Sequence, residues 1–171
     1  MFVYVPCIGN RQAICVPERQ VYGDQFVTAT VKVRGDKLYF LTQKGARRFR
    51  LLATSLAQPG IAHAQVIVPE GRAVISSFAL AREGLYVLER EGATSRLLRV
   101  AENGLHSRPV PLPFDGYIDT PVTDPRQSGA LFDMQGWVRP PRVFSYDLGG
   151  YRAGTGNPTT RPSGRRNSAT P

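Results

Sequence analysis

The chain has 171 residues, of which 42% are hydrophobic and 20% are charged, an ordinary balance for one soluble globular domain with a real core. Its net charge is +9, but no acidic residue follows Asp147 while four arginines do, so part of the excess belongs to the last segment. The charge therefore predicts weak attraction to polyanions and gives no support for a sequence-specific nucleic-acid function.

Residues 1–23 are expected to form an irregular lead-in, because Pro6, Gly9, Pro17 and Gly23 interrupt two short apolar runs. The first residues carry no basic region, and their apolar run breaks at Pro6. We therefore expect neither a signal peptide nor a membrane span, and the predicted location is cytoplasmic.

Two cysteines, Cys7 and Cys15, lie in this lead-in. A zinc site would need His63 and His106 as additional ligands from distant loops. A disulfide would need an oxidising compartment, whereas two free thiols need neither condition. We expect free thiols, no metal site and no cofactor.

From Asp24 the chain changes to short strands separated by turns. Over 26–33 small apolar residues alternate with threonine and lysine, which is typical of a half-buried strand. The turn that follows contains Gly35, which supplies the positive φ that a tight hairpin requires. Further strands of this first unit are expected at 38–43, 49–56 and 66–68.

The same order of strands and turns follows twice more. Strands are expected at 73–81, 85–90, 96–101 and 108–112, and then at 117–122, 130–134 and 142–147. Leu38-Tyr39 aligns with Leu85-Tyr86, Gly45 with Gly92 and Leu51-Leu52 with Leu97-Leu98, and Leu131 and Val143 continue the series of Leu85 and Leu97. The repeat is about 46–47 residues long, within the range of about 40–50 that is typical of a β-propeller blade.

The predicted fold is therefore all-β, an incomplete β-propeller over 24–150 with about three four-stranded antiparallel blades. The blades are expected at about 24–70, 71–114 and 115–150. Residues 151–171 contain no aliphatic side chain larger than alanine and are rich in glycine, proline, serine, threonine and arginine. Such a segment cannot bury enough apolar surface to offset its chain entropy, so we expect a disordered basic C-terminal tail.

Trp137, followed by Pro140-Pro141, joins two strands of the third unit. A large ring at this place is expected to pack between neighbouring blades, and an aromatic patch for substrate is the alternative.

The remaining candidate side chains favour simple interpretations. His63 and His106 are predicted to be loop histidines, since neither has an adjacent nucleophile and orienting acid. The basic run of the first unit is expected to be a solvated face, with a grip on a phosphate backbone or a peptide carboxylate as the alternative. The basic run consists of Lys44, Arg47, Arg48 and Arg50.

Asp119, Asp124 and Asp133 are expected to be scattered turn acids, without the spacing of a calcium loop.

Seven short sequence segments of the chain occur in an order that matches a known pattern. They are LYFLTQKGARRFRLLATSL (38–56), VIVPEG (66–71), LYVLEREGATSRLLRV (85–100), VPLPFDG (110–116), SGALFD (128–133), GW (136–137) and PPRVFSYD (140–147). Together and in this order, over about 24–150, they resemble the N-terminal propeller domain of the prolyl oligopeptidase family of serine peptidases.

The resemblance implies a seven-bladed propeller that caps an α/β-hydrolase domain with a Ser-Asp-His triad and admits short peptides cleaved after proline. This sequence departs from that pattern, because it has no Gly-x-Ser-x-Gly phrase, no match to the triad histidine and no further blades. We expect a truncated product or an excised domain fragment, with no catalytic residue and no peptidase activity of its own.

The predicted function is the non-catalytic, substrate-gating propeller portion of a prolyl oligopeptidase-like serine endopeptidase. The resemblance implies the α/β-hydrolase domain and short proline-containing peptides as partners. Open blade faces predict self-association, whereas no specific nucleic acid and no membrane is expected to bind. The alternative is a stand-alone β-rich interaction module that binds a protein or a polyanion through a propeller face or the basic tail.

Overall fold

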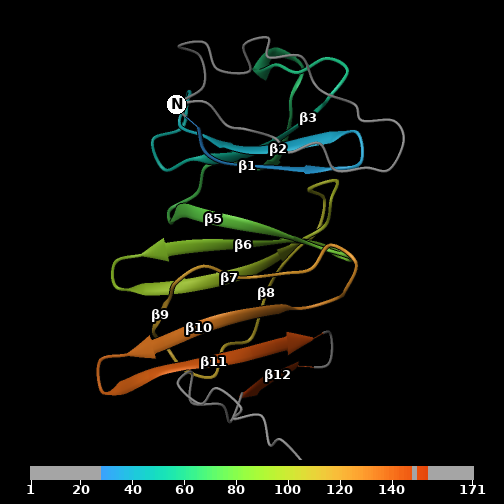
Figure 1. The fold of residues 1–171 in the computed structure, drawn as a ribbon. Helices are drawn as coiled ribbons and strands as arrows, with labels where there is room; N and C mark the ends of the chain where they lie inside the picture. The colour runs from blue at the N-terminus through green and yellow to red at the C-terminus, as the bar shows by residue number, and fades with distance from the viewer. Residues whose placement is uncertain (1–27, 148–149, 154–171) are drawn as a thin grey trace, which may run out of the picture.

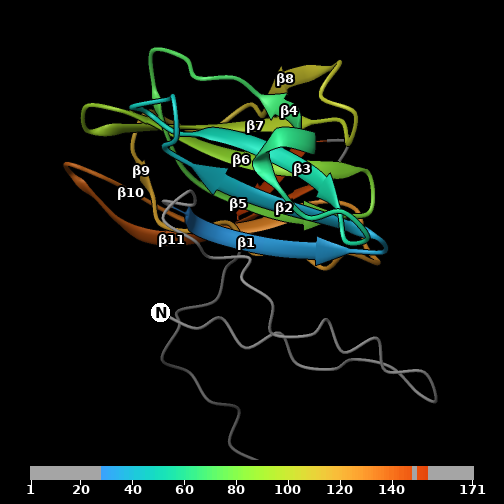
Figure 2. The same cartoon turned by 90° about the horizontal axis from the view of Figure 1, so that it is seen from above.

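The computed structural model describes residues 28–147 and 150–153, so the predicted lead-in at 1–23 and most of the predicted tail lie outside the described residues. Within the described part, three four-stranded antiparallel sheets follow one another along the chain as a stack (Figure 1). Seen from above, the sheets overlie one another (Figure 2). This arrangement confirms the predicted all-β fold of an incomplete propeller, and each sheet is one blade.

Within each blade the strands are hydrogen-bonded in chain order. The first blade contains β1 (Thr28–Arg34), β2 (Lys37–Thr42), β3 (Arg50–Ser55) and β4 (Gln65–Val68), with a short 3-10 helix, η1 (Ile61–His63), before β4. The second contains β5 (Val74–Ala81), β6 (Gly84–Glu91), β7 (Thr94–Val100) and β8 (Ser107–Pro109). The third contains β9 (Tyr117–Ile118), β10 (Ala130–Gly136), β11 (Arg139–Asp147) and β12 (Gly150–Ala153).

β12 continues the third blade beyond the predicted boundary at 150, so 151–153 do not belong to a disordered tail. Its residues pair with β11 from Asp147–Gly150 to Phe144–Ala153. An edge strand is held by backbone hydrogen bonds to one neighbour and does not need an apolar sequence. Because this segment is polar, the sequence pattern did not predict the strand.

Two hydrophobic clusters fill the spaces between the blades, because side chains alternate between the two faces of each strand. Tyr39 and Leu41 of the first blade pack against Phe78 and Leu85 of the second. The second space is filled by Tyr86, Leu88, Leu97, Val110, Ile118, Ala130, Phe132, Met134 and Phe144, together with Ala81.

The third blade is aligned with the second by two glycines. Gly84 begins β6 and Gly129 directly precedes β10, with φ of 141° and 101°, and a Cβ on either would overlap a carbonyl oxygen of the neighbouring strand. Ala130, and not Leu131, is therefore the equivalent of Leu85, so the predicted alignment of Leu131 was one residue out, whereas Val143 pairs with Asp133 as Leu97 pairs with Leu88 and keeps its predicted place. A shift of one residue reverses the face of a strand residue, and Leu131 accordingly lies on the outer face, 50% exposed.

The two ends of the stack differ. On the outer face of the first blade Phe40 and Leu52 are buried, and Leu56 and Ile61 from the β3–β4 connection pack against them. The outer face of the third blade exposes Val122, Leu131 and Val143. Among the described residues, no helix is long and apolar enough to cross a membrane.

Candidate functional site

The two histidines of the chain lie on separate connections. His63 ends η1, and His106 lies between β7 and β8; both side chains are exposed. The structure therefore does not bring the two imidazoles into one buried site. That the chain contains no catalytic residue stays a prediction.

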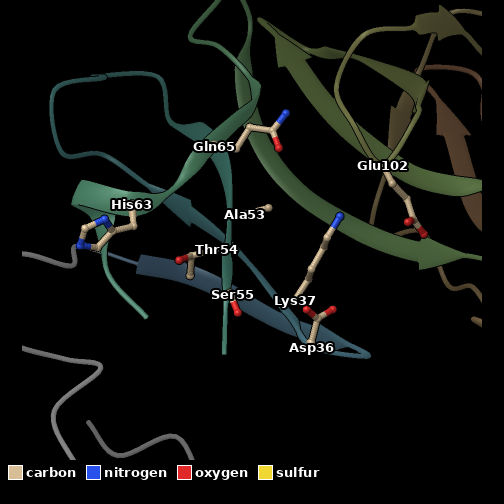
Figure 3. A pocket seen from close by; sticks show the side chains of 8 residues that line it. All are labelled: Asp36, Lys37, Ala53, Thr54, Ser55, His63, Gln65 and Glu102. Carbon is tan, nitrogen blue, oxygen red and sulfur yellow. The ribbon is translucent and has the colours of Figure 1, made fainter. Parts of the chain in front are cut away.

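A hollow of about 180 Å³ lies where the first blade meets the second (Figure 3). Its lining includes Ser55, His63 and Asp36, the residue types of a serine-hydrolase triad. The Ser55 hydroxyl accepts the Ala57 N–H at 3.2 Å, and the His63 ring points away from Ser55 (Figure 3). A serine without a base within hydrogen-bond reach is a poor nucleophile, so this arrangement does not support acyl transfer.

Metal binding has no support in the described part of the chain, where no group of three or more histidine, cysteine, aspartate or glutamate side chains could hold an ion. The three predicted turn acids do not form one cluster, and the turn assignment was wrong for Asp133, which lies in β10 and whose carbonyl accepts the Asp119 N–H at 3.4 Å. The Asp124 carboxylate accepts hydrogen bonds from the Arg126 side chain and backbone, which hold the pKa of Asp124 below its usual range. Cys7 and Cys15 lie outside the described residues.

The connections between strands lie at two opposite ends of the blades. The second-to-third-strand connections, at 43–49, 92–93 and 137–138, lie together at the left of Figure 1, and we call this end the hairpin rim. At the other end lie 34–36, 82–83, 101–106 and 124–129, which we call the opposite rim.

One side chain of the opposite rim links all three blades. The Arg34 guanidinium, at the end of β1, forms an ion pair with Glu102 of the second blade. It also donates to the backbone oxygens of Arg82 in the second blade, at 3.2 Å, and of Pro125 in the third, at 3.3 Å. A guanidinium suits this place because its five donors lie in a fixed planar fork.

A carboxylate of the opposite rim joins the second blade to the third. Glu83 accepts the Tyr86 hydroxyl at 2.6 Å and the Gly129 N–H at 2.9 Å. Burial alone would raise the pKa of Glu83, but these hydrogen bonds outweigh burial and hold it below its usual range. Burial and the bond to Glu83 both raise the pKa of Tyr86. Arg34, Glu83 and Glu102 of the opposite rim thus form their contacts within the stack.

The hairpin rim presents an apolar pair to water. Trp137 and Val138 are 95% and 93% exposed, so the prediction that Trp137 packs between blades was wrong. These two residues form the whole β10–β11 connection, beyond the last strand pair, Gly136–Arg139, and hence beyond the space between the sheets. Phe132 and Phe144 fill that space instead, with ring centroids 6.0 Å apart.

The base of this hairpin is supported by an aromatic ring. The Arg139 guanidinium lies 4.8 Å from the centroid of the Phe114 ring, and Phe114 meets Phe144 edge to face at 6.1 Å. Pro140 and Pro141 follow in β11 and fix their own φ angles. The exposed tip therefore stands on an ordered base.

The predicted basic run lies on the same rim. Lys44, Arg47 and Arg48 are exposed, as expected for a solvated face, and Arg50 is half-buried. The Arg48 backbone N–H donates to the Glu70 carboxylate at 2.8 Å. In the described ranges these four side chains form no ion pair.

Comparison with known families identifies one match. The family model described as prolyl oligopeptidase, N-terminal beta-propeller domain, matches residues 10–152. No curated protein matches the sequence.

Solved structures show the same arrangement of blades. A structure from a structural and mechanistic study of two prolyl endopeptidases superposes with a TM-score of 0.68 at 24% identity, covering 72% of this chain and 19% of that chain. Prolyl oligopeptidase B from Galerina marginata superposes with a TM-score of 0.66 at 14% identity, covering 79% of this chain and 20% of that one. The chain thus spans about a fifth of the length of these enzymes, and the likeness at this identity is one of fold.

Proposed function

The chain belongs to the prolyl oligopeptidase N-terminal β-propeller family, and from this premise we propose that it serves a serine endopeptidase as a steric gate. The observation that carries the proposal is the family match over 10–152, together with three stacked blades of the same fold. In intact prolyl oligopeptidases the propeller belongs with an α/β-hydrolase domain. This chain would limit access to an active site whose residues that domain supplies.

A steric gate requires blades that do not separate, and this chain ties its blades at both rims. At the hairpin rim the Ile75 N–H donates to the Arg48 carbonyl at 3.1 Å, and the Ser95 N–H donates to the Gly116 carbonyl at 2.8 Å. At the opposite rim Arg34 and Glu83 make the contacts described above. These ties support a role in which the stack acts as a rigid wall.

The proposed partners are the α/β-hydrolase domain and short proline-containing peptides. A second copy is also proposed to bind weakly through the outer face of the third blade, where Val122, Leu131 and Val143 are exposed. A cytoplasmic location belongs to the same proposal.

The test is a chimera of a prolyl endopeptidase in which residues 28–153 replace the matching blades. We expect the chimera to cleave a short chromogenic proline peptide and to leave a long unfolded protein uncut, while the isolated chain cleaves neither. Circular dichroism and a melting curve establish that the chimera is folded. Cleavage of the short peptide by the isolated chain, or of the long substrate by a folded chimera, would contradict the proposal.

The exposed cations of the hairpin rim favour a second candidate, an interaction module for polyanions. A band shift with single-stranded RNA that weakens steeply with salt and disappears when residues 154–171 are deleted, which keeps β12, would assign this role to the tail. If the shift survives the deletion, the hairpin rim is the binding surface.

A further inference from the structure

We propose that the hairpin rim is the surface that docks on the α/β-hydrolase domain, and that Trp137 and Val138 are its anchor. The inference rests on the proposed function for the identity of the partner. It specifies which rim of the stack contacts that partner and which side chains make the contact.

The tip residues are not required by the turn that they form. The equivalent connection of the second blade is also two residues long and consists of Gly92-Ala93. Among the described residues Phe49 is the only non-glycine with positive φ, so neither Trp137 nor Val138 occupies a backbone conformation that would restrict the choice of residue. Two adjacent apolar side chains in water cost free energy that burial against a partner recovers.

The tip is also prepared for binding. Arg139 over the Phe114 ring holds the base of the hairpin, and the two prolines limit the freedom of β11. The backbone that carries Trp137 therefore needs little further ordering when the tip is buried. Large aromatic side chains such as tryptophan supply most of the binding energy at many interfaces.

Charged side chains of the two rims differ in their contacts, although exposed Arg82 of the opposite rim is in no ion pair within the described residues. On the opposite rim Arg34 and Glu102 pair with each other, and Glu83 is held by Tyr86 and Gly129. On the hairpin rim Lys44 and Arg47 are exposed and form no ion pair within the described part of the chain. The free cations lie on the first blade and the apolar anchor on the third, so this rim fits a broad partner surface with an apolar pocket at one end and carboxylates at the other.

The outer face of the third blade is a weaker candidate for this partner. Asp133 pairs with Val143 there, whereas the equivalent positions of the other blades hold Leu41 and Leu88, both fully buried. Burying this face would remove from water a carboxylate that has no ion-pair partner among the described residues of the blade. The hairpin rim carries no such penalty at its tip.

The test uses the single tryptophan of the chain as a reporter. The full 171-residue chain is labelled with 5-fluorotryptophan, which gives one ¹⁹F resonance, and is titrated with the separately produced α/β-hydrolase domain of a prolyl endopeptidase. We expect the resonance to shift on binding. A soluble gadolinium chelate should broaden the resonance of the free chain and broaden that of the bound chain much less. Raising the salt concentration should weaken the binding.

Matched variants distinguish specific binding through the anchor from nonspecific adhesion of exposed apolar side chains. Val138→Asp keeps the label and is measured by the ¹⁹F titration, whereas Trp137→Ala removes the label and is measured by calorimetry. Each variant should weaken binding by at least about tenfold. Leu105→Ala removes an apolar side chain that is 75% exposed on the opposite rim, and it should leave binding unchanged. All three positions are exposed, and unchanged melting temperatures establish that the variants are folded.

Three results would overturn the inference. One is binding with an unmoved ¹⁹F resonance, and another is no binding between the folded chain and a hydrolase domain that still cleaves a short peptide. The third is a resonance that moves with the concentration of the chain alone or with single-stranded RNA, since the tip would then contact a second copy or a polyanion. The length selectivity of the chimera tests the gating function separately, so either proposal can fail while the other stands.

Discussion

Glu83 accepts the backbone N–H of Gly129 at 2.9 Å and thereby connects the start of β6 to the start of β10 in the next blade. The same oxygen accepts the Tyr86 hydroxyl at 2.6 Å. In the first blade the corresponding residues are Asp36 and Tyr39, and the buried Tyr39 hydroxyl has no partner among the described residues. The repeat therefore keeps the tyrosine in both blades but completes its hydrogen bond in one.

Glu83→Ala should lower the free energy of unfolding by about 2–3 kcal/mol, because two partly buried donors lose their acceptor. Tyr86→Phe should cost about 1–2 kcal/mol, and the double variant less than the sum of the two. Urea denaturation measures all three. The control is Glu91→Ala, which breaks an exposed pair with Arg96 at 3.3 Å and should change stability by less than about 0.5 kcal/mol. Equal midpoints for Glu83→Ala and Glu91→Ala would show that the link does not stabilise the stack.

The same carboxylate should make stability depend on pH. The pKa of Glu83 lies below its ordinary value of 4.5, so the unfolded state takes up the proton first as the pH falls. Its contribution is therefore present above pH 4.5 and is lost as the pH falls through the pKa of the folded state. Glu83→Gln should flatten this acid loss in unfolding curves recorded between about pH 3 and 6.

Glu89 should act in the opposite direction. Burial raises the pKa of Glu89, and the nearby Arg96 opposes that shift only in part. The contribution of Glu89 is therefore present below pH 4.5 and is lost as the pH rises through its folded-state pKa. Glu89→Gln should remove a decline in stability just above pH 4.5 that Glu83→Gln leaves in place. If both variants give the same profile, the assignment of the two slopes is wrong.

Tyr39→Phe should leave stability unchanged or raise it by up to about 1 kcal/mol. The variant removes a buried hydroxyl that has no partner in the described part of the chain and keeps the packed ring. Tyr86→Phe, its equivalent one blade later, is the matched control and should be destabilising. Thermal melts of the two variants side by side measure the contrast. Equal losses would mean that the Tyr39 hydroxyl has an acceptor.

Gly129→Ala should cost about 2–4 kcal/mol, because φ is 101° and a Cβ there would overlap the carbonyl oxygen of Tyr146. Gly71→Ala is the control, since a Cβ at Gly71 meets nothing within 4 Å. Chemical denaturation should therefore separate two substitutions that are identical in chemistry. Similar midpoints would show that β11 moves aside at little cost.

The repeat and its turn glycines were enough to predict the fold. Strands alternating with turns at a constant spacing predict blades, and the φ of 59° at Gly35 confirms the role assigned to that residue. The repeat alone could not predict the register of the third blade, because Leu85 and Leu131 are both leucines near the start of a strand. The positive φ of Gly129, which fixes the alignment, is not visible from residue type alone.

The side chains that join the blades could not be predicted for a different reason. Arg34 reaches Pro125 across 91 positions, and Glu83 reaches Gly129 across 46, so no local pattern marks either contact. Trp137 was misplaced because its hydrophobicity was given more weight than the length of its loop. A two-residue connection directly after Gly136 leaves a side chain outside the sheet whatever its chemistry.

Asp133 should keep the outer face of the third blade from associating strongly. Its equivalents in the other blades, Leu41 and Leu88, are fully buried, while Asp133 lies exposed on the same face as Leu131 and Val143. Asp133→Leu joins these two side chains into one apolar surface. Burying an additional leucine provides roughly 1.5–3 kcal/mol, enough to strengthen self-association at least about tenfold.

Sedimentation velocity over a concentration series measures this change. Asp133→Asn is the control, because it removes the charge and adds no aliphatic surface, so it should strengthen association much less than Asp133→Leu. Adding Leu131→Lys to Asp133→Leu should return the chain to its original behaviour, since the new charge lies on the same face. If Asp133→Leu sediments like the unmodified chain, apolar contact through this face does not limit association. If the asparagine variant associates as strongly as the leucine variant, charge repulsion alone kept the copies apart.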